Sequence, residues 1–166
     1  MEKKSRPNPK RKGRSLQRQM ALDVIFEADL RGTDLSALLE ERKVISTHMV
    51  PIGDYGVTIV ATYADNAPDV DSMIEAASPN WPIERMSVVD RCLLRVGATE
   101  LMFLDVDLPV VVSEIKSLAR DISTDRAVPF LMGVINRIGE IRAGETAGLN
   151  DIIEKLPVTG KEPEPK

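Results

Sequence analysis

The chain has 166 residues, enough for one domain or two small subdomains that share a core. Hydrophobic residues make up 43% of it and aromatic residues only 4%, so aliphatic side chains must fill the interior. The single cysteine, Cys92, excludes an intrachain disulfide and any zinc site built from several cysteines, and it fits a reducing cytoplasm. No apolar run approaches the roughly 20 residues that span a bilayer, and the basic N-terminus lacks the apolar stretch of a signal peptide.

The net charge of −4 conceals a strong asymmetry along the chain. Residues 1–18 contain eight basic side chains and one acidic side chain, whereas the rest of the chain contains 14 basic and 25 acidic ones. A basic arm on an acidic body predicts a polyanionic partner for the arm. The acidic body argues against a nucleic-acid groove that covers the whole protein, and it leaves room for a second, basic partner.

The N-terminus predicts a charged arm that leads into a helix. Residues 1–13 combine many charges with Pro7 and Pro9, and we expect a disordered basic arm because they offer little apolar surface to bury. An apolar stripe of helical period begins at Leu16. We expect this first helix to end near Gly32, since glycine accepts the left-handed conformation that stops helices.

Three further helices are predicted before residue 80. A short one follows Asp34, and two more occupy residues 53–66 and 70–77 on either side of Pro68. Prolines then interrupt the chain around residues 79–82. We therefore place a boundary there, between an N-terminal helical subdomain of residues 14–80 and a C-terminal one of residues 81–145.

The second subdomain begins with a helix that is apolar on more than one side, which is typical of a central, buried helix. One of its stripes consists of Met86, Val89, Leu93 and Val96, and the other of Leu94, Ala98 and Leu101. A second helix should start at Pro109. A third should be capped by Ser123 or Thr124, with Pro129 in its first turn, and should run to about Ile141. We expect residues 146–166 to be a tail that is mostly disordered.

No motif in the chain predicts catalysis, a cofactor or a metal. The only histidine, His48, lies near no residue pattern typical of a nucleophile. Gly53 and Gly56 lack the strand and the Lys-Ser/Thr pair of a phosphate-binding loop. Cys92 falls in the helix predicted to be buried, where a small core residue is the simpler interpretation. We expect a protein that is not an enzyme.

The second half contains, in this order, VDRCLLRVGATELMF, DVDLPVVVSEIKSLARDIS and FLMGVINRI. The first half contains RQMALDVIFEADLRG. Together these segments resemble the NusB family over roughly residues 14–141, in a style closest to its actinobacterial members. The order of four segments carries the resemblance, since no single one is diagnostic.

The resemblance implies an all-α fold of two perpendicular three-helix bundles with about seven helices. It also implies an RNA-binding transcription antitermination factor of the cytoplasm. Such a factor acts with NusE, a small-subunit ribosomal protein, on single-stranded boxA-type RNA. The complex joins the RNA polymerase antitermination complex during ribosomal RNA synthesis. No membrane partner is implied.

The basic arm supplies the candidate RNA-binding residues. If the first helix extends back far enough, residues spaced by three and four share one face. Arginine pairs with phosphate and stacks on unpaired bases, which suits single-stranded RNA. The candidates are Lys10, Arg11, Lys12, Arg14 and Arg18.

By the same resemblance, Phe26 and Asp90 match positions that NusB proteins offer to NusE. Simple alternatives exist for both: core packing for Phe26, and a favourable interaction with a helix N-terminus for Asp90. Three residues depart from the family pattern. Phe26 replaces a tyrosine and loses its hydroxyl, Met132 replaces an asparagine, and Pro129 stands where a polar or basic residue is usual.

Two other functions fit parts of the sequence. Some RNA cytosine methyltransferases carry a NusB-like domain at their N-terminus, in which case this chain would be a fragment of such an enzyme. A helical adaptor that has lost RNA binding and keeps only a protein partner is the other alternative. The eight basic residues before position 19 argue against the adaptor.

Overall fold

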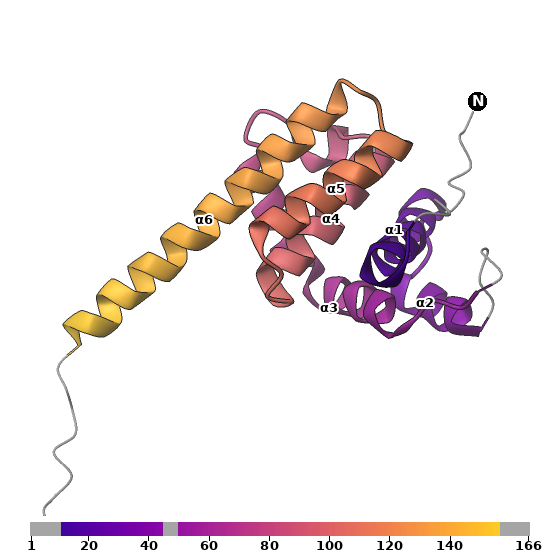
Figure 1. Ribbon diagram of the computed structural model, residues 1–166, viewed down its shortest axis with the longest axis horizontal. Coiled ribbons are helices and arrows are strands. Elements are labelled where there is room, and N and C mark those ends of the chain that lie inside the picture. Colours follow the sequence, from indigo (N-terminus) through magenta and orange to yellow (C-terminus); the bar gives the residue numbers. More distant parts are fainter. Residues whose placement is uncertain (1–10, 45–49, 157–166) are drawn as a thin grey trace, which may run out of the picture.

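The computed structural model describes residues 11–44 and 50–156. Lys10 and His48 lie outside the described residues. Within these ranges all regular structure is helical (Figure 1), which confirms the all-α prediction. Six α-helices and one short 3-10 helix follow one another as α1 (Gly13–Arg31), α2 (Leu35–Val44), α3 (Asp54–Ala77), η1 (Ile83–Arg85), α4 (Val88–Phe103), α5 (Leu108–Ile122) and α6 (Ala127–Lys155).

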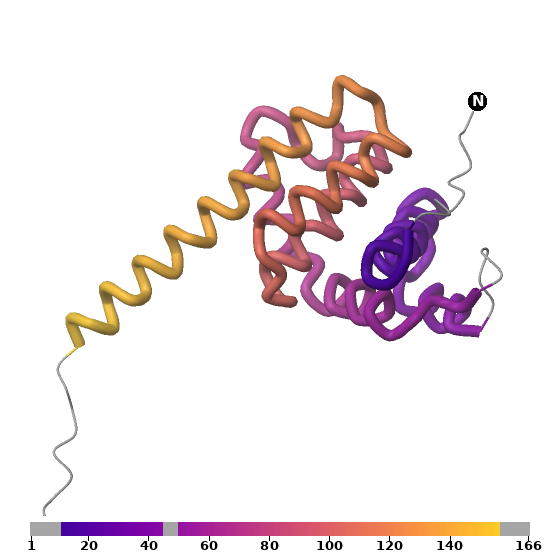
Figure 2. Tube along the Cα trace, in the orientation of Figure 1, coloured from indigo at the N-terminus to yellow at the C-terminus, as the bar shows by residue number. Residues whose placement is uncertain are grey.

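The helices form two groups that cross each other. In Figure 1 α1 is seen almost end-on, whereas α4, α5 and α6 run side by side within the plane of the view. The tube in Figure 2 shows α2 and α3 grouped with α1 in the other half. α1 and α3 both pack directly on α4, and one cluster of buried side chains runs through all six α-helices. The two halves therefore share a single core.

Polar side chains and one glycine set the helix ends. Gly32 adopts φ +64° after α1, and its N–H donates to the carbonyls of Ala28 and Asp29, as expected for a glycine stop. Asp34 Oδ2 accepts the Ala37 N–H at 2.9 Å and so begins α2. Ser87 Oγ accepts the Asp90 N–H at 3.1 Å at the start of α4, and Thr124 Oγ1 accepts the Ala127 N–H at 3.2 Å before α6.

The two helices predicted on either side of Pro68 are joined end to end across a kink and together form α3. α3 continues through the proline, with its only non-helical backbone at Asn66 (φ −128°, ψ 20°). Proline lacks an N–H and its ring crowds the preceding turn, so a bend there is expected. The Asn66 side chain donates to the Thr62 carbonyl at 2.8 Å. The structure thus confirms two helical segments with a break between them, and the break lies at Asn66, two residues before Pro68.

The last helix is longer than predicted. We expected it to end near Ile141 and the chain to be mostly disordered from residue 146, but α6 is helical as far as Lys155. Asp151 and Lys155 are one turn apart on this extension and form an ion pair at 2.8 Å. Gly144 and Gly148 make this extension hard to predict from the sequence, because glycine is unfavourable in a helix interior.

Candidate nucleic-acid and partner interfaces

Arg11 fixes the end of the basic arm onto α5. Its guanidinium forms an ion pair with Asp121 Oδ2 at 2.8 Å and donates to Ser117 Oγ at 2.9 Å, and the side chain is only 7% exposed. Lys12 and Arg14 are exposed beside it. Of the predicted RNA contacts from the arm, the structure thus leaves Lys12 and Arg14 on the surface and places Arg11 as their anchor.

Arg14 lies on an aromatic ring. Its Cζ atom is 4.5 Å from the centre of the Tyr55 ring, within the range of a cation–π interaction. Tyr55 is half-buried near the start of α3, and its hydroxyl donates to Glu100 Oε2 at 2.5 Å. Burial and the bond to Glu100 raise the pKa of Tyr55 to about 12, so the hydroxyl remains a donor at neutral pH. α3 and α4 therefore hold the ring on which Arg14 rests.

Arg18 has a different position from the one predicted. It follows Arg14 by one helical turn, as the spacing required, but its side chain is 3% exposed and faces Glu100. Its Nε atom donates to both Glu100 oxygens, at 2.7 and 2.9 Å, and Glu100 is fully buried. Burial lowers the pKa of Arg18, but the hydrogen bond and charge of Glu100 outweigh it and raise the pKa overall. This burial argues against a direct contact between Arg18 and RNA.

Two open hollows flank α5. The first, of about 380 Å³, lies between the arm and α5, and Ser15 Oγ donates to Glu114 Oε1 at 2.8 Å on its wall. Its lining consists of Arg11, Lys12, Ser15, Ser113, Glu114 and Ser117. The second, of about 520 Å³, lies between α5 and α6. Both hollows present basic side chains, so the cationic surface extends beyond the arm.

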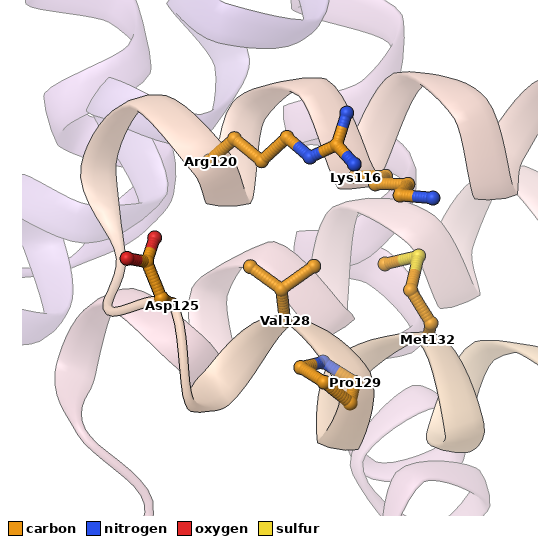
Figure 3. Close-up of a pocket in the computed structure, with 6 residues that line it drawn as sticks. All are labelled: Lys116, Arg120, Asp125, Val128, Pro129 and Met132. Atoms are coloured by element: carbon orange, nitrogen blue, oxygen red, sulfur yellow. The ribbon is translucent and has the colours of Figure 1, made fainter.

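The second hollow combines charge with an apolar floor. Lys116 and Arg120 project from α5 across from Val128, Pro129 and Met132 of α6, with Asp125 at the end near the connecting loop (Figure 3). Two of the three departures from the family pattern, Pro129 and Met132, thus lie on this floor. Lys116 and Arg120 were missed from the sequence, although their spacing of four on an amphipathic helix was a usable signal.

An aromatic pair is exposed next to Pro129 in the sequence. Phe130 in α6 and Trp81 before η1 have ring centres 6.1 Å apart in a tilted arrangement, a favourable geometry for aromatic rings. Trp81 is 51% exposed and Phe130 is 37% exposed. Both rings thus present part of their surface to solvent, and both were missed as functional candidates from the sequence.

The predicted partner residues lie on adjoining helix segments. Asp29 follows Phe26 by one turn of α1, and Arg91 follows Asp90 by one residue in α4. Asp29 and Arg91 form an ion pair at 2.6 Å. Phe26 is half-buried against the core. Asp90 is half-buried as well, and its Oδ1 accepts the Ser123 hydroxyl at 2.6 Å. The two positions thus lie on helix segments that the Asp29–Arg91 ion pair joins, and each of them also has a structural contact.

Asp29 holds this region together and makes its stability depend on pH. The hydrogen bond from Arg91 lowers the pKa of Asp29, the charges of Arg95 and Arg91 lower it further, and burial opposes them. A carboxylate with a lowered folded pKa stabilises the fold above its unfolded pKa of about 3.9, and this contribution is lost as pH falls through the folded value.

We therefore expect Asp29→Asn to be less stable than the parent protein at neutral pH, with a difference that shrinks below about pH 4. Urea unfolding of both proteins between neutral pH and about pH 2.5 measures this difference. A difference that stays constant over the whole range would show that the Asp29 charge does not stabilise the fold.

Cys92 is fully buried in α4, and burial raises the pKa of its thiol to about 12. The thiol is therefore protonated at neutral pH and has the character of a core residue.

Over residues 11–44 and 50–156, no three His, Cys, Asp or Glu side chains gather as a metal site would require. In the same part of the chain, no helix has the length and apolar content needed to cross a membrane.

Residues 15–140 match the NusB family. The chain is 37% identical over 126 residues to a transcription antitermination protein NusB of Kineococcus radiotolerans, covering 75% of this chain and 91% of that protein. It is 35% identical to the Streptomyces coelicolor protein of the same name, covering 78% and 94%. A solved structure of the antitermination factors NusB and NusE in complex with dsRNA superimposes with a TM-score of 0.68 at 29% identity, covering 77% of this chain and 96% of that one. The chain belongs to the NusB family.

Proposed function

We propose that this protein is an RNA-binding transcription antitermination factor that acts with NusE on boxA-type RNA as part of the RNA polymerase antitermination complex. Family membership and the names of the similar proteins support the antitermination role over a methyltransferase fragment. The similar solved complex, which contains NusB, NusE and dsRNA, supports both partners. The observation that carries RNA binding in this chain is the basic surface on both sides of α5.

The proposed RNA path crosses α5 from one hollow to the other. On one side Lys12 and Arg14 are exposed, and Arg11 ties them to α5 through Ser117 and Asp121. On the other side Lys116 and Arg120 line the second hollow. These four exposed or pocket-lining cations supply contacts to successive phosphates of a strand laid across the helix.

Aromatic surface near the cations favours single-stranded RNA. Unpaired bases stack on aromatic rings and on guanidinium planes, while double-stranded RNA hides its base faces. The guanidinium of Arg14 lies over Tyr55, with its Cζ atom 4.5 Å from the ring centre. We propose that bases stack on this surface while Lys12, Arg14, Lys116 and Arg120 bind phosphates.

A matched pair of double variants tests the RNA surface. Lys12→Ala/Arg14→Ala removes two proposed phosphate contacts, and each contact to single-stranded RNA contributes about −0.7 to the slope of log affinity against log salt concentration. We expect the slope to flatten by about one to two units, together with a loss of affinity. Fluorescence anisotropy with a boxA-type single strand and with a duplex, at several salt concentrations, measures both quantities.

The control is Lys43→Ala/Lys155→Ala, which removes the same charge at the ends of α2 and α6, away from α5 (Figure 1). An unchanged slope in the Lys12/Arg14 variant would place the RNA surface elsewhere. Equal changes in both double variants would mean that overall charge, rather than a site, attracts the RNA. Absence of RNA binding in the parent protein, with NusE binding intact, would favour the adaptor.

A further inference from the structure

The end of α6 exposes an unusual amount of apolar surface. Residues 143–156 are all exposed, and this segment projects past the other helices (Figures 1 and 2). It carries Leu149, Ile152, Ile153 and Leu156, which are 57%, 59%, 55% and 58% exposed. Four large aliphatic side chains within two helical turns form a concentrated patch, which typically marks an interaction site. We call these four residues the apolar seam.

The apolar seam continues the face of α6 that packs on the core. With 3.6 residues per turn, Leu156 lies five full turns after Ile138 and therefore on the same side of the helix. Ile138, Ile135 and Leu131 are all fully buried against the other helices. The seam is thus a packing face that extends beyond its own bundle. The family match ends at residue 140, so the seam lies outside the matched region.

The order of the seam residues has two-fold symmetry. Residues 149–156 read Leu-x-x-Ile-Ile-x-x-Leu, the same in both directions. An isologous dimer requires a surface that is complementary to itself about a two-fold axis. Two antiparallel copies of this helix, centred between Ile152 and Ile153, set Leu149 opposite Leu156 of the second copy and Ile152 opposite Ile153 of the second copy. Each layer then pairs aliphatic side chains of similar size.

The charged residues do not interrupt this pairing. By helical geometry Asp151 and Glu154 lie on the side opposite the seam, and Asp151 forms its ion pair with Lys155 at 2.8 Å. We propose that the protein self-associates as an antiparallel dimer through the apolar seams of two α6 helices. A contact of four side chains per copy is smaller than a standard stable interface, so the dimer is weak and depends on concentration.

Sedimentation velocity on the full chain, from about 1 µM to 1 mM, tests the proposal. We expect the parent protein to shift from monomer towards dimer over this range. Ile152→Lys/Ile153→Lys should stay monomeric throughout, with an unchanged melting temperature of the bundle, since both side chains are exposed. Ala143→Lys/Ala147→Lys adds the same charge on the other side of the exposed helix and should dimerise like the parent.

Cysteine cross-linking tests the antiparallel register. A mixture of Leu149→Cys and Leu156→Cys proteins should form a disulfide-linked dimer, because those positions face each other. Leu149→Cys alone should not, because its two copies would be offset by seven residues, about 10 Å along the helix. The native Cys92 is fully buried and adds little background. A monomer at every concentration, a dimer that survives the double lysine variant, or cross-linking of Leu149→Cys alone would each overturn the proposal.

Discussion

Replacing Glu100 with leucine is expected to lower the free energy of unfolding by about 3–5 kcal/mol. Glu100 is fully buried and binds both the Arg18 guanidinium, at 2.7 and 2.9 Å, and the Tyr55 hydroxyl. Leucine would leave a buried cation without its counter-ion and a phenol without its acceptor. Breaking a buried pair from one side is costly because the remaining charge is not solvated.

Urea unfolding of the Glu100→Leu variant and of Arg18→Met/Glu100→Leu separates two contributions to stability. One is the cost of leaving Arg18 without its counter-ion, and the other is the contribution of the intact pair. The double variant removes both charges and should recover much of the lost stability, because a buried pair replaced by apolar groups is often neutral. Asp121→Ala is the exposed control. Its ion pair with Arg11 has a carboxylate that is 43% exposed, so we expect a loss below about 1 kcal/mol. A Glu100→Leu protein as stable as the parent would contradict the buried ion pair.

The second large effect is expected at Asp90, where Asp90→Lys should weaken NusE binding by at least about 30-fold. NusE is the partner that the family resemblance implies, and a basic partner is attracted to the acidic body of this chain. Asp90 lies in the first turn of α4, close to the Asp29–Arg91 ion pair that joins α4 to the end of α1. Isothermal titration calorimetry with purified NusE measures the change.

Two controls separate a partner contact from a structural role. Ser123→Ala removes the hydroxyl that donates to Asp90 at 2.6 Å but keeps the charge, so NusE binding should persist with a modest loss of stability. Asp90→Asn keeps an acceptor for Ser123 and removes only the charge, so it should weaken binding while the melting temperature stays close to that of the parent. Full NusE affinity in a folded Asp90→Lys protein would show that the partner face lies elsewhere.

The Glu100→Leu substitution should also affect the proposed RNA surface, because Tyr55 contacts both Glu100 and Arg14. The carboxylate of Glu100 holds the hydroxyl of Tyr55, and the ring of Tyr55 lies under Arg14. The buried Arg18 guanidinium, which binds Glu100, is 5.6 Å from the centre of the same ring. The position of an exposed arginine thus depends on a salt bridge inside the core. A residue predicted to bind RNA, Arg18, instead supports one that we propose to bind it.

Local sequence determined where most helices begin and end. Gly32 was predicted to stop the first helix because glycine tolerates positive φ, and it does so at φ +64°. Asp34 was placed before the second helix, and its carboxylate caps it. Pro109 and Pro129 were both placed in first turns, where a missing N–H costs little, and both lie there. These features involve residues within a few positions of one another, so a linear pattern contains the information.

Tertiary structure alone decided which side chains on a predicted face are buried. The spacing of Arg14 and Arg18 correctly placed them on one side of a helix, but only the packing of α4 on α1 covers one and leaves the other exposed. Arg18 and Glu100 are 82 positions apart, a separation at which no periodicity relates two residues. The same holds for Lys116 and Arg120, whose hollow exists only because α6 folds back alongside α5. Periodicity reports which residues share a face, whereas the element that packs against that face comes from elsewhere in the chain.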